Sequence, residues 1–229
     1  MYISYYAKHD GIMPTMKIGI IGSGDVAQSL GKGLVSLGHD VMISSRDPKK
    51  KELQAWKSKS GKKAMVGTTT EAASFGDLCF LAVAWHAGED VIAQVRPELA
   101  GKVVIDVTNP LVFNDDGPPT LAVGHTMSGG EIVQSSLPDS HVVKALNIIN
   151  HESMVNPSYK SGTPTMFIAG NNKSAILHVT ELLQEMGWKD IVDLGEIEKA
   201  RLLEPLCLLW VEYGIANNTW KHAISILKN

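Results

Sequence analysis

The sequence predicts an α/β protein built on a doubly wound parallel sheet, and three observations support this fold class. Apolar runs of strand length alternate with segments of helical spacing from Lys17 to Leu146. The run at residues 78–83 is continuously apolar, which is typical of a strand covered on both faces. The first run ends at a glycine-rich turn that leads directly into a helical segment.

Glycine and proline residues mark the ends of several predicted elements. Gly38 and Gly61 follow helical segments as C-terminal caps, and Pro97 is expected to close another helix. Strands are expected at residues 17–22, 40–44, 64–68, 78–83, 102–107 and 141–146. Helices are expected at residues 25–37, 48–61, 69–75, 89–95 and 129–137.

The composition changes after Asn150, and this change predicts a domain boundary. Residues 150–164 are rich in Asn, Ser, Gly and Pro, as a linker or surface loop is. A strand at 165–170, a helix at 173–186, a strand at 190–195 and a long apolar helix from Glu196 are expected to follow. The expected segments are therefore a loose leader at 1–15, a sheet domain at 16–150 and a small C-terminal α/β domain at 151–229.

Composition argues against several classes of partner. The net charge of -3 gives no basic bias toward nucleic acid or anionic membranes, and no apolar segment is long enough to span a bilayer. Cys79 and Cys207 lie in apolar runs, so we expect buried thiols in a reducing compartment, which predicts a cytoplasmic protein. No Cys/His cluster has the spacing of metal ligands.

The glycine-rich turn has the spacing of a dinucleotide-binding loop. In "GSGDVA", Gly22, Gly24 and Ala27 match the pattern G-x-G-x-x-G/A between a strand and a helix. Gly22 permits a tight turn, Gly24 lets the backbone approach a pyrophosphate, and Ala27 keeps the helix close to the strand. The helix N-terminus offers free N–H groups to the phosphates. A plain tight turn is the alternative.

The second strand ends in Ser45 and Arg46, where an NAD-binding protein would carry a carboxylate. A hydroxyl and a permanently charged guanidinium suit the 2′-phosphate of NADP, and Lys50 lies within reach after one helical turn. The alternative is a solvated basic face. Asp47 is interpreted as the start of the next helix.

Two further stretches follow strands that end at the same sheet edge. Ala84, Trp85 and His86 follow the fourth strand, and residues 108–110 (Thr108, Asn109 and Pro110) follow the fifth. Ligands of open α/β sheets bind at this edge, so these residues are expected to line the nicotinamide half of the cofactor. A surface histidine and a packing tryptophan are the alternatives for His86 and Trp85.

These motifs together resemble the coenzyme F420-dependent NADP oxidoreductase family from Met16 almost to the end of the chain. The resemblance rests on "MKIGIIGSGDVAQSLGKGLVSLGHDVMISSRDP", "LAVAWHA", "VVIDVTNPL", "GGEIVQSSLPDSHVVKALNII" and "ARLLEPLCLLWVEYGIA". It implies a Rossmann domain, a small C-terminal domain, a dimer and hydride exchange between NADPH and a deazaflavin.

The resemblance also implies which residues bind each part of the cofactor and the acceptor. The pyrophosphate would be held by Gly22, Ser23, Gly24, Asp25 and Val26, and the 2′-phosphate by Ser45, Arg46 and Lys50. Ala84 and Trp85 would border the nicotinamide, and Asn147 and Ile149 would contact the acceptor ring. Members that use the deazaflavin tend to have histidine where Asn147 stands and proline where Ala84 stands. The acceptor is therefore open between coenzyme F420 and a flavin.

Three functional hypotheses follow. The first is an NADPH-dependent reductase of a deazaflavin or flavin-like ring, a reaction that needs proximity more than acid–base catalysis. The second is an NADP-dependent reductase of a small carbonyl or imine, with His86 as proton donor. The third is a non-catalytic NADP(H) sensor.

The long C-terminal helix predicts a homodimer. Its apolar residues, which give more apolar face than a small domain needs, are Leu202, Leu203, Leu206, Leu209, Trp210 and Tyr213. An internal core helix is the alternative.

Overall fold

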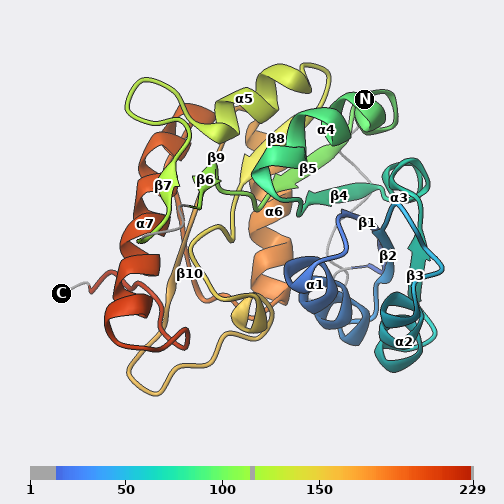
Figure 1. Ribbon diagram of the computed structural model, residues 1–229, viewed down its shortest axis with the longest axis horizontal. Helices are drawn as coiled ribbons and strands as arrows, with labels where there is room; N and C mark the ends of the chain where they lie inside the picture. Colours follow the sequence, from blue (N-terminus) through green and yellow to red (C-terminus); the bar gives the residue numbers. More distant parts are fainter. Residues whose placement is uncertain (1–13, 114–116, 228–229) are drawn as a thin grey trace.

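The computed structural model describes residues 14–113 and 117–227 and contains an eight-stranded sheet in the order β10-β9-β8-β5-β4-β1-β2-β3 (Figure 1). All neighbouring strands run parallel except β8 and β9. The strands are β1 (Lys17–Ile21), β2 (Asp40–Ser44), β3 (Ala64–Gly67), β4 (Leu78–Leu81), β5 (Val103–Asp106), β8 (His141–Lys144), β9 (Thr165–Gly170) and β10 (Asp190–Asp193).

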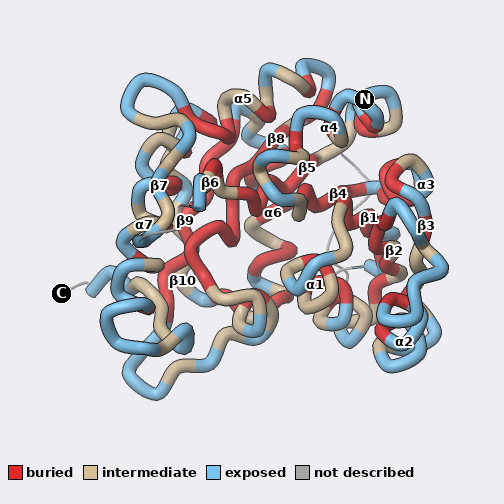
Figure 2. The backbone as a smooth tube through the Cα atoms, in the orientation of Figure 1, coloured by how far each residue is buried: buried red, intermediate tan, exposed pale blue. Residues whose placement is uncertain are grey.

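Helices cover both faces of the sheet. They are α1 (Asp25–Ser36), α2 (Lys51–Ser60), α3 (Thr69–Phe75), α4 (Gly88–Leu99), α5 (Gly129–Ser136), α6 (Lys173–Glu185) and α7 (Ala200–Ala216). One core cluster contains Leu30 of α1, Trp56 of α2 and Leu182 of α6. A second contains residues of α3, α4 and α5, among them Ile92 and Val133. Buried residues accordingly run along the strands (Figure 2), and the predicted doubly wound fold is confirmed.

The chain reverses its direction across the sheet between β1 and β4. β1 is followed by β2 and β3 on one side, and β4, β5 and β8 continue on the other. This is the strand order of a Rossmann sheet, in which the two neighbouring loops diverge at the reversal and leave a crevice. The loops after β1, β2, β4, β5 and β8 therefore meet at one edge of the molecule.

The C-terminal segment extends the same sheet. β9 pairs antiparallel with β8 and parallel with β10. Leu203 and Cys207 of α7 pack on Phe167 and Ala169 of β9. The domain boundary at residue 150 stays a prediction, and most of the predicted leader lies outside the described residues.

Several predicted boundaries were wrong. α4 continues through Pro97 to Leu99, because Ile92, Val95 and Leu99 form one buried stripe whose packing outweighs the proline's missing N–H. α2 begins at Lys51 rather than residue 48. The last helix begins at Ala200, after a short 3₁₀ helix (Ile197–Lys199).

Four further short elements were not expected from the sequence. A two-stranded hairpin is formed by β6 (Leu111–Val112) and β7 (Thr120–Leu121), and 3₁₀ turns occur at Trp85–Ala87 and His151–Ser153. They are too short for hydrophobic periodicity to indicate them.

Both cysteines are free and buried, as predicted. Burial raises the pKa of the Cys79 thiol to about 11, so this thiol is protonated at neutral pH. Within the described residues, no helix combines the length and hydropathy needed to cross a bilayer.

Candidate NADP site

Gly22 shapes the turn after β1 and cannot be replaced by a larger residue. Its φ of +141° lies in a region that side chains rarely adopt, and a Cβ there would lie 2.1 Å from the carbonyl oxygen of Ala82. The Gly22 N–H donates to Ser44 Oγ at 2.8 Å, and the Ser44 N–H donates back to the Gly22 carbonyl at 3.1 Å. The turn is therefore fixed to the end of β2.

Gly24 presents its backbone to open space. A Cβ built on Gly24 meets no heavy atom of the described residues within 4 Å. Gly24 is also the N-cap of α1, and no side chain of the described part of the protein caps this helix. Its first N–H groups are thus available to an anion such as a pyrophosphate. Gln28 Nε2 holds the adjoining Ser23 carbonyl at 2.8 Å.

The Ser45–Arg46 pair lies at the end of β2, beside this turn. Arg46 and Lys50 are both exposed, and Ser45 is buried. The Ser45 hydroxyl lies 3.1 Å from both the carbonyl oxygen and the N–H of Asp47, so it shapes the turn. It would have to rotate to donate to a phosphate, whereas the Arg46 guanidinium is already accessible.

The prediction that Asp47 starts α2 was wrong. Its carboxylate accepts the N–H of Lys49 at 3.1 Å, and the Lys50 N–H donates to the Asp47 carbonyl at 3.3 Å. Asp47 therefore stabilises a separate turn, and Lys50 is the N-cap of α2. This turn carries Arg46 at the sheet edge.

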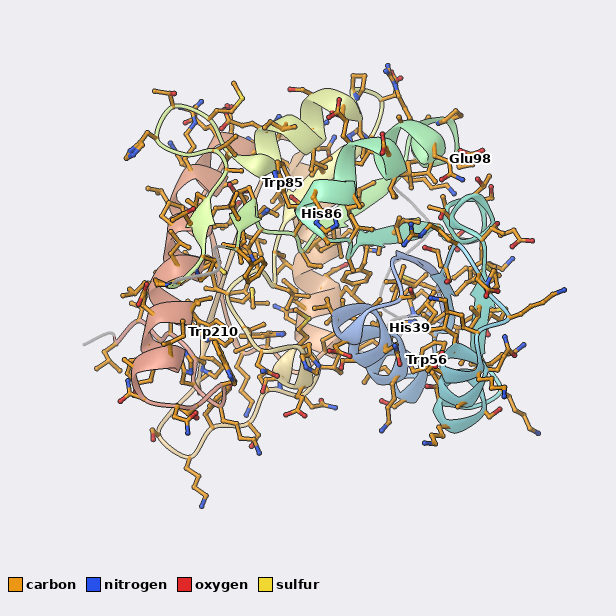
Figure 3. All side chains as sticks on the ribbon, in the orientation of Figure 1. His39, Trp56, Trp85, His86, Glu98 and Trp210 are labelled. Atoms are coloured by element: carbon orange, nitrogen blue, oxygen red, sulfur yellow. The ribbon has the colours of Figure 1, made fainter. Side chains whose placement is uncertain are left out.

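The residues after β4 form a 3₁₀ turn that carries Trp85 and His86 (Figure 3). Ala84 and His86 are exposed, and Trp85 is half-buried. The Trp85 ring packs against the first turn of α5, since a Cβ added to Gly129 would lie 3.0 Å from Trp85 Cζ3. Trp85 is thus a fixed wall of this edge, and His86 lies at its surface.

The loops after β5 and β8 are joined by paired amides. Asn109 Nδ2 donates to the Asn147 carbonyl at 2.8 Å, and Asn147 Nδ2 donates to Asn109 Oδ1 at 2.9 Å and to the Leu203 carbonyl at 3.0 Å. Asn147 Oδ1 has no hydrogen-bond partner among the described residues. Ile149 is buried two residues further on.

Thr108 and Pro110 are buried on either side of Asn109. The Thr108 N–H and hydroxyl both donate to Asp106 Oδ1, at 2.9 and 2.7 Å. The Thr108 hydroxyl proton is therefore used inside the protein, and Asn109 is the more accessible of the two polar side chains. The structure thus brings together the residues predicted for the cofactor and acceptor at one edge, and their roles stay predictions.

Sequence reasoning missed a buried ion triad behind this edge. It consists of Asp106 at the end of β5, Lys144 at the end of β8 and Glu204 in α7, each at most 1% exposed. Each charged residue stands within an apolar run: "VVIDV", "HVVKAL" and "LLEPLCLLW". A charge in such a run needs a buried partner, and this pattern could have indicated the triad.

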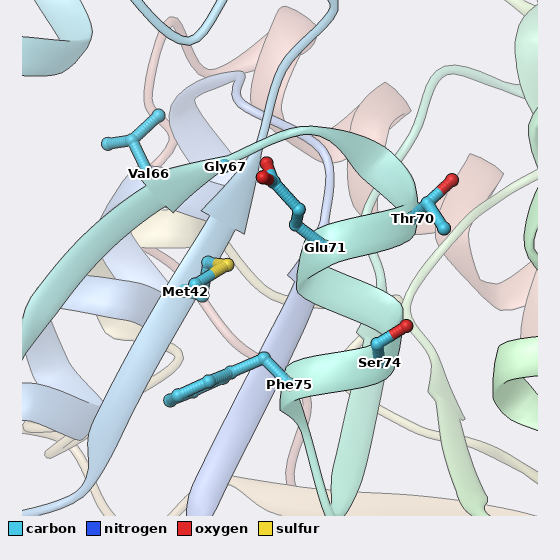
Figure 4. Close-up of a pocket in the computed structure, with 7 residues that line it drawn as sticks. All are labelled: Met42, Val66, Gly67, Thr70, Glu71, Ser74 and Phe75. Carbon is cyan, nitrogen blue, oxygen red and sulfur yellow. The ribbon is translucent and has the colours of Figure 1, made fainter.

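A groove of about 490 Å³ lies beside the site, between β2, β3 and α3 (Figure 4). It is lined by Met42, Val66, Gly67, Thr70, Glu71, Ser74 and Phe75. None of the residues predicted to bind the cofactor or acceptor lines this groove, so it is separate from the predicted site.

The strand order and the glycine turn are those of a dinucleotide-binding Rossmann protein, and the family match makes this protein an NADP-dependent oxidoreductase. Residues 17–110 match the family described as "NADP oxidoreductase coenzyme F420-dependent". The F420-dependent NADP reductase of Methanocaldococcus jannaschii is 30% identical over 213 residues, covering 87% of this chain and 93% of the relative. The chain belongs to the family of F420-dependent NADP reductases.

Two further proteins are similar to this chain. A solved structure of a provisionally assigned F420-dependent NADP reductase from Arthrobacter sp. FB24 has a TM-score of 0.88 and 31% identity, covering 93% of this chain and all of that chain. Metalloreductase STEAP3 of Rattus norvegicus is 32% identical over 195 residues, which cover 84% of this chain. This chain spans only 37% of the length of that metalloreductase.

Proposed function

We propose that this protein transfers a hydride between NADP(H) and a deazaflavin, coenzyme F420, or a flavin-like ring. The observation that carries the proposal is the open glycine turn beside an exposed arginine, at the edge where the loops of β4, β5 and β8 also end. The similarity to F420-dependent NADP reductases over most of the chain supports the choice of acceptor.

The residues present suit NADP. The backbone at Gly24 and the uncapped N-terminus of α1 would hold the pyrophosphate, and Arg46 and Lys50 would hold the 2′-phosphate. Ser45 closes the turn that presents Arg46. Ser45 and Arg46 directly follow β2, at the position where an NAD-binding protein would carry a carboxylate, and the nearby Asp47 carboxylate accepts the Lys49 N–H.

The chain's task in this reaction is orientation. A bound nicotinamide supplies or receives the hydride, and this transfer needs no general acid. Asn109 and Trp85 would border the nicotinamide, and Asn147 and Ile149 would lie on the acceptor side. Because the paired amides join Asn109 to Asn147, the two sides keep a fixed spacing.

The experiment that tests this proposal follows NADPH oxidation at the nicotinamide absorbance. The purified protein is given coenzyme F420, FMN, FAD or no acceptor, with NADH in parallel. Turnover of NADPH with coenzyme F420 or a flavin, well above that with NADH, supports the proposal. Saturable NADPH binding without turnover of any ring acceptor would contradict it and favour the sensor or the carbonyl and imine reductase.

Replacing His86 by alanine separates the ring reductase from a carbonyl or imine reductase. His86 is exposed in the 3₁₀ turn after β4, where a proton donor for a carbonyl would stand. Since a ring acceptor needs no such donor, we expect the kcat of the variant to stay within about threefold of wild type. A loss of about a hundredfold, measured by the same absorbance assay, would instead favour the carbonyl or imine reductase.

We also propose that the protein is a homodimer formed through α7. Leu203 and Trp210 were predicted to belong to the free face, but they are buried in the core of the monomer. Leu202, Leu209 and Tyr213 remain 60%, 62% and 52% exposed on one stripe of the helix. A contiguous apolar stripe of this kind indicates a protein interface.

The double variant Leu202→Lys/Leu209→Lys is expected to be a monomer. Light scattering should give a mass near 24.8 kDa for the variant and about twice this mass for wild type, since lysines on the stripe prevent its burial. Leu177→Lys is the control, because Leu177 is equally exposed (60%) but lies on α6. A wild-type mass of 24.8 kDa at micromolar concentration would contradict the dimer.

A further inference from the structure

Lys144 is the centre of the ion triad, and all of its hydrogen-bond donors have acceptors. Its Nζ lies 2.9 Å from Asp106 Oδ2, 3.0 Å from Glu204 Oε1 and 2.6 Å from the Thr108 carbonyl oxygen. An ammonium group has three N–H donors, so each one has a partner. Burial lowers the pKa of Lys144, but the two carboxylates more than compensate, and the pKa lies above its usual value. Lys144 is therefore held as an ammonium group whose three N–H bonds are all directed at acceptors inside the protein.

The second carboxylate of the triad is held by the N-terminus of α5. Glu204 Oε2 accepts the N–H of Gly129 at 2.8 Å, and Oε1 accepts the N–H of Gly130 at 2.9 Å. The positive end of the α5 dipole offsets the excess negative charge of two carboxylates against one lysine. A Cβ at Gly130 would lie only 2.9 Å from Ala200 Cβ, so the glycine lets α7 approach. Glu204 thus connects α7 to both α5 and β8.

The triad also contacts the loops that line the predicted site. Asp106 holds the Thr108 N–H and hydroxyl through Oδ1, and Lys144 holds the Thr108 carbonyl, so the residue before Asn109 is fixed at three atoms. On the acceptor side, Asn147 donates to the carbonyl of Leu203, the neighbour of Glu204. Two consecutive residues of α7 therefore fix the ends of β5 and β8 against each other.

Between Lys144 and Asn147 the chain makes a strained bend. Leu146 has a φ of +60°, which is costly for a residue with a branched side chain, and it is completely buried. The bend turns the chain so that Asn147 meets Asn109. The hydrogen bonds of Lys144 and Asn147 on either side hold Leu146 in this conformation.

We propose that Asp106, Lys144 and Glu204 are positioning residues that set the nicotinamide half of the cofactor site against the acceptor side. This inference rests on the proposed function. According to this proposal, the triad affects the positions of the Thr108–Asn109 loop and of Asn147. The glycine turn and Arg46 lie on other loops, so the triad should not affect them.

The test compares two ligands of the full-length Glu204→Gln variant. Glutamine keeps the size of the side chain but removes the charge and places a donor against the Gly129 or Gly130 N–H or Lys144 Nζ. The dissociation constant of NADPH should rise about tenfold, because its nicotinamide half contacts the displaced loop. That of adenosine 2′,5′-bisphosphate, which lacks the nicotinamide half, should stay within about twofold. With an acceptor that wild type turns over, kcat should fall by about a hundredfold.

Arg201→Gln is the matched control. Arg201 pairs with Glu131 and also joins α7 to α5, but at the surface and away from Lys144. Its loss should leave both dissociation constants unchanged. If Glu204→Gln melts below the assay temperature, Asp106→Asn tests the same network from β5.

Equal weakening of both ligands, or no change in either, would overturn the proposal. Equal weakening would mean that the triad supports only the fold, and no change would mean that the loops keep their positions without it. Neither ligand measurement requires an acceptor. Failure of the acceptor assay in wild type would therefore reject the proposed function while these measurements still decide the role of the triad.

Discussion

Replacement of Arg46 by alanine is expected to raise the dissociation constant of NADPH by about thirtyfold and to leave that of NADH nearly unchanged. Arg46 is exposed on the turn that Ser45 and Asp47 stabilise, so its loss removes a guanidinium without disturbing packing. The two cofactors differ only in the 2′-phosphate, so their ratio isolates this one contact. Fluorescence titration of the bound nicotinamide gives both constants.

Lys59→Ala is a suitable control for Arg46→Ala. Lys59 is an exposed cation in the last turn of α2, one helix length from the site. This variant tests whether general positive charge, rather than a defined phosphate contact, attracts NADPH. If Arg46→Ala weakens both cofactors equally, or if Lys59→Ala has the same effect, the assignment of the 2′-phosphate to Arg46 is wrong.

The Gly22→Ala variant is expected to lose stability, whereas the Gly24→Ala variant is expected to lose NADPH affinity. At Gly22 the methyl group would lie 2.1 Å from a backbone oxygen at a φ of +141°, and we expect a loss of more than about 3 kcal/mol of unfolding free energy. At Gly24 the methyl group meets no atom of the described residues, so stability should fall by less than about 1 kcal/mol. NADPH affinity should nevertheless fall at least about tenfold at Gly24, because the methyl group would occupy the space that we propose for the pyrophosphate.

Urea unfolding and NADPH titration of both variants check this pair. The two residues are neighbours in one motif, so each variant serves as the control for the other. Normal NADPH affinity of Gly24→Ala would mean that the pyrophosphate does not approach this turn. A Gly22→Ala variant of wild-type stability would mean that the turn adopts another conformation than the one described.

Local patterns predicted the ends of two elements correctly. β2 and α3 have the predicted ends, because Ser44 is followed by turn residues and Thr68 caps α3 through a reciprocal bond with Glu71. The end of α4 was missed because its apolar stripe continues past Pro97 into the core, which propensity alone does not reveal. The antiparallel pairing of β8 and β9 depends on the path of the chain between them, for which the sequence carries no periodic pattern.

For the site, the sequence predicted where the side chains lie more reliably than which residues they contact. A strand followed by polar residues predicts that they lie at a sheet edge, and Asn109 and Asn147 do lie together there. Their hydrogen bonds, the packing of Trp85 on Gly129 and the triad join residues far apart in the chain. Such contacts depend on the directions of side chains in the folded protein, and local sequence patterns do not indicate these directions.

The most direct test of hydride transfer follows deuterium from NADPH labelled at C4 of the nicotinamide into the reduced acceptor. With coenzyme F420, wild-type protein is expected to deliver the deuterium to a carbon of the deazaflavin ring, detectable by mass spectrometry, because a hydride that passes directly from ring to ring would not exchange with water. With coenzyme F420, appearance of the label in solvent during turnover, with none in the product, would contradict direct transfer between NADP(H) and the deazaflavin.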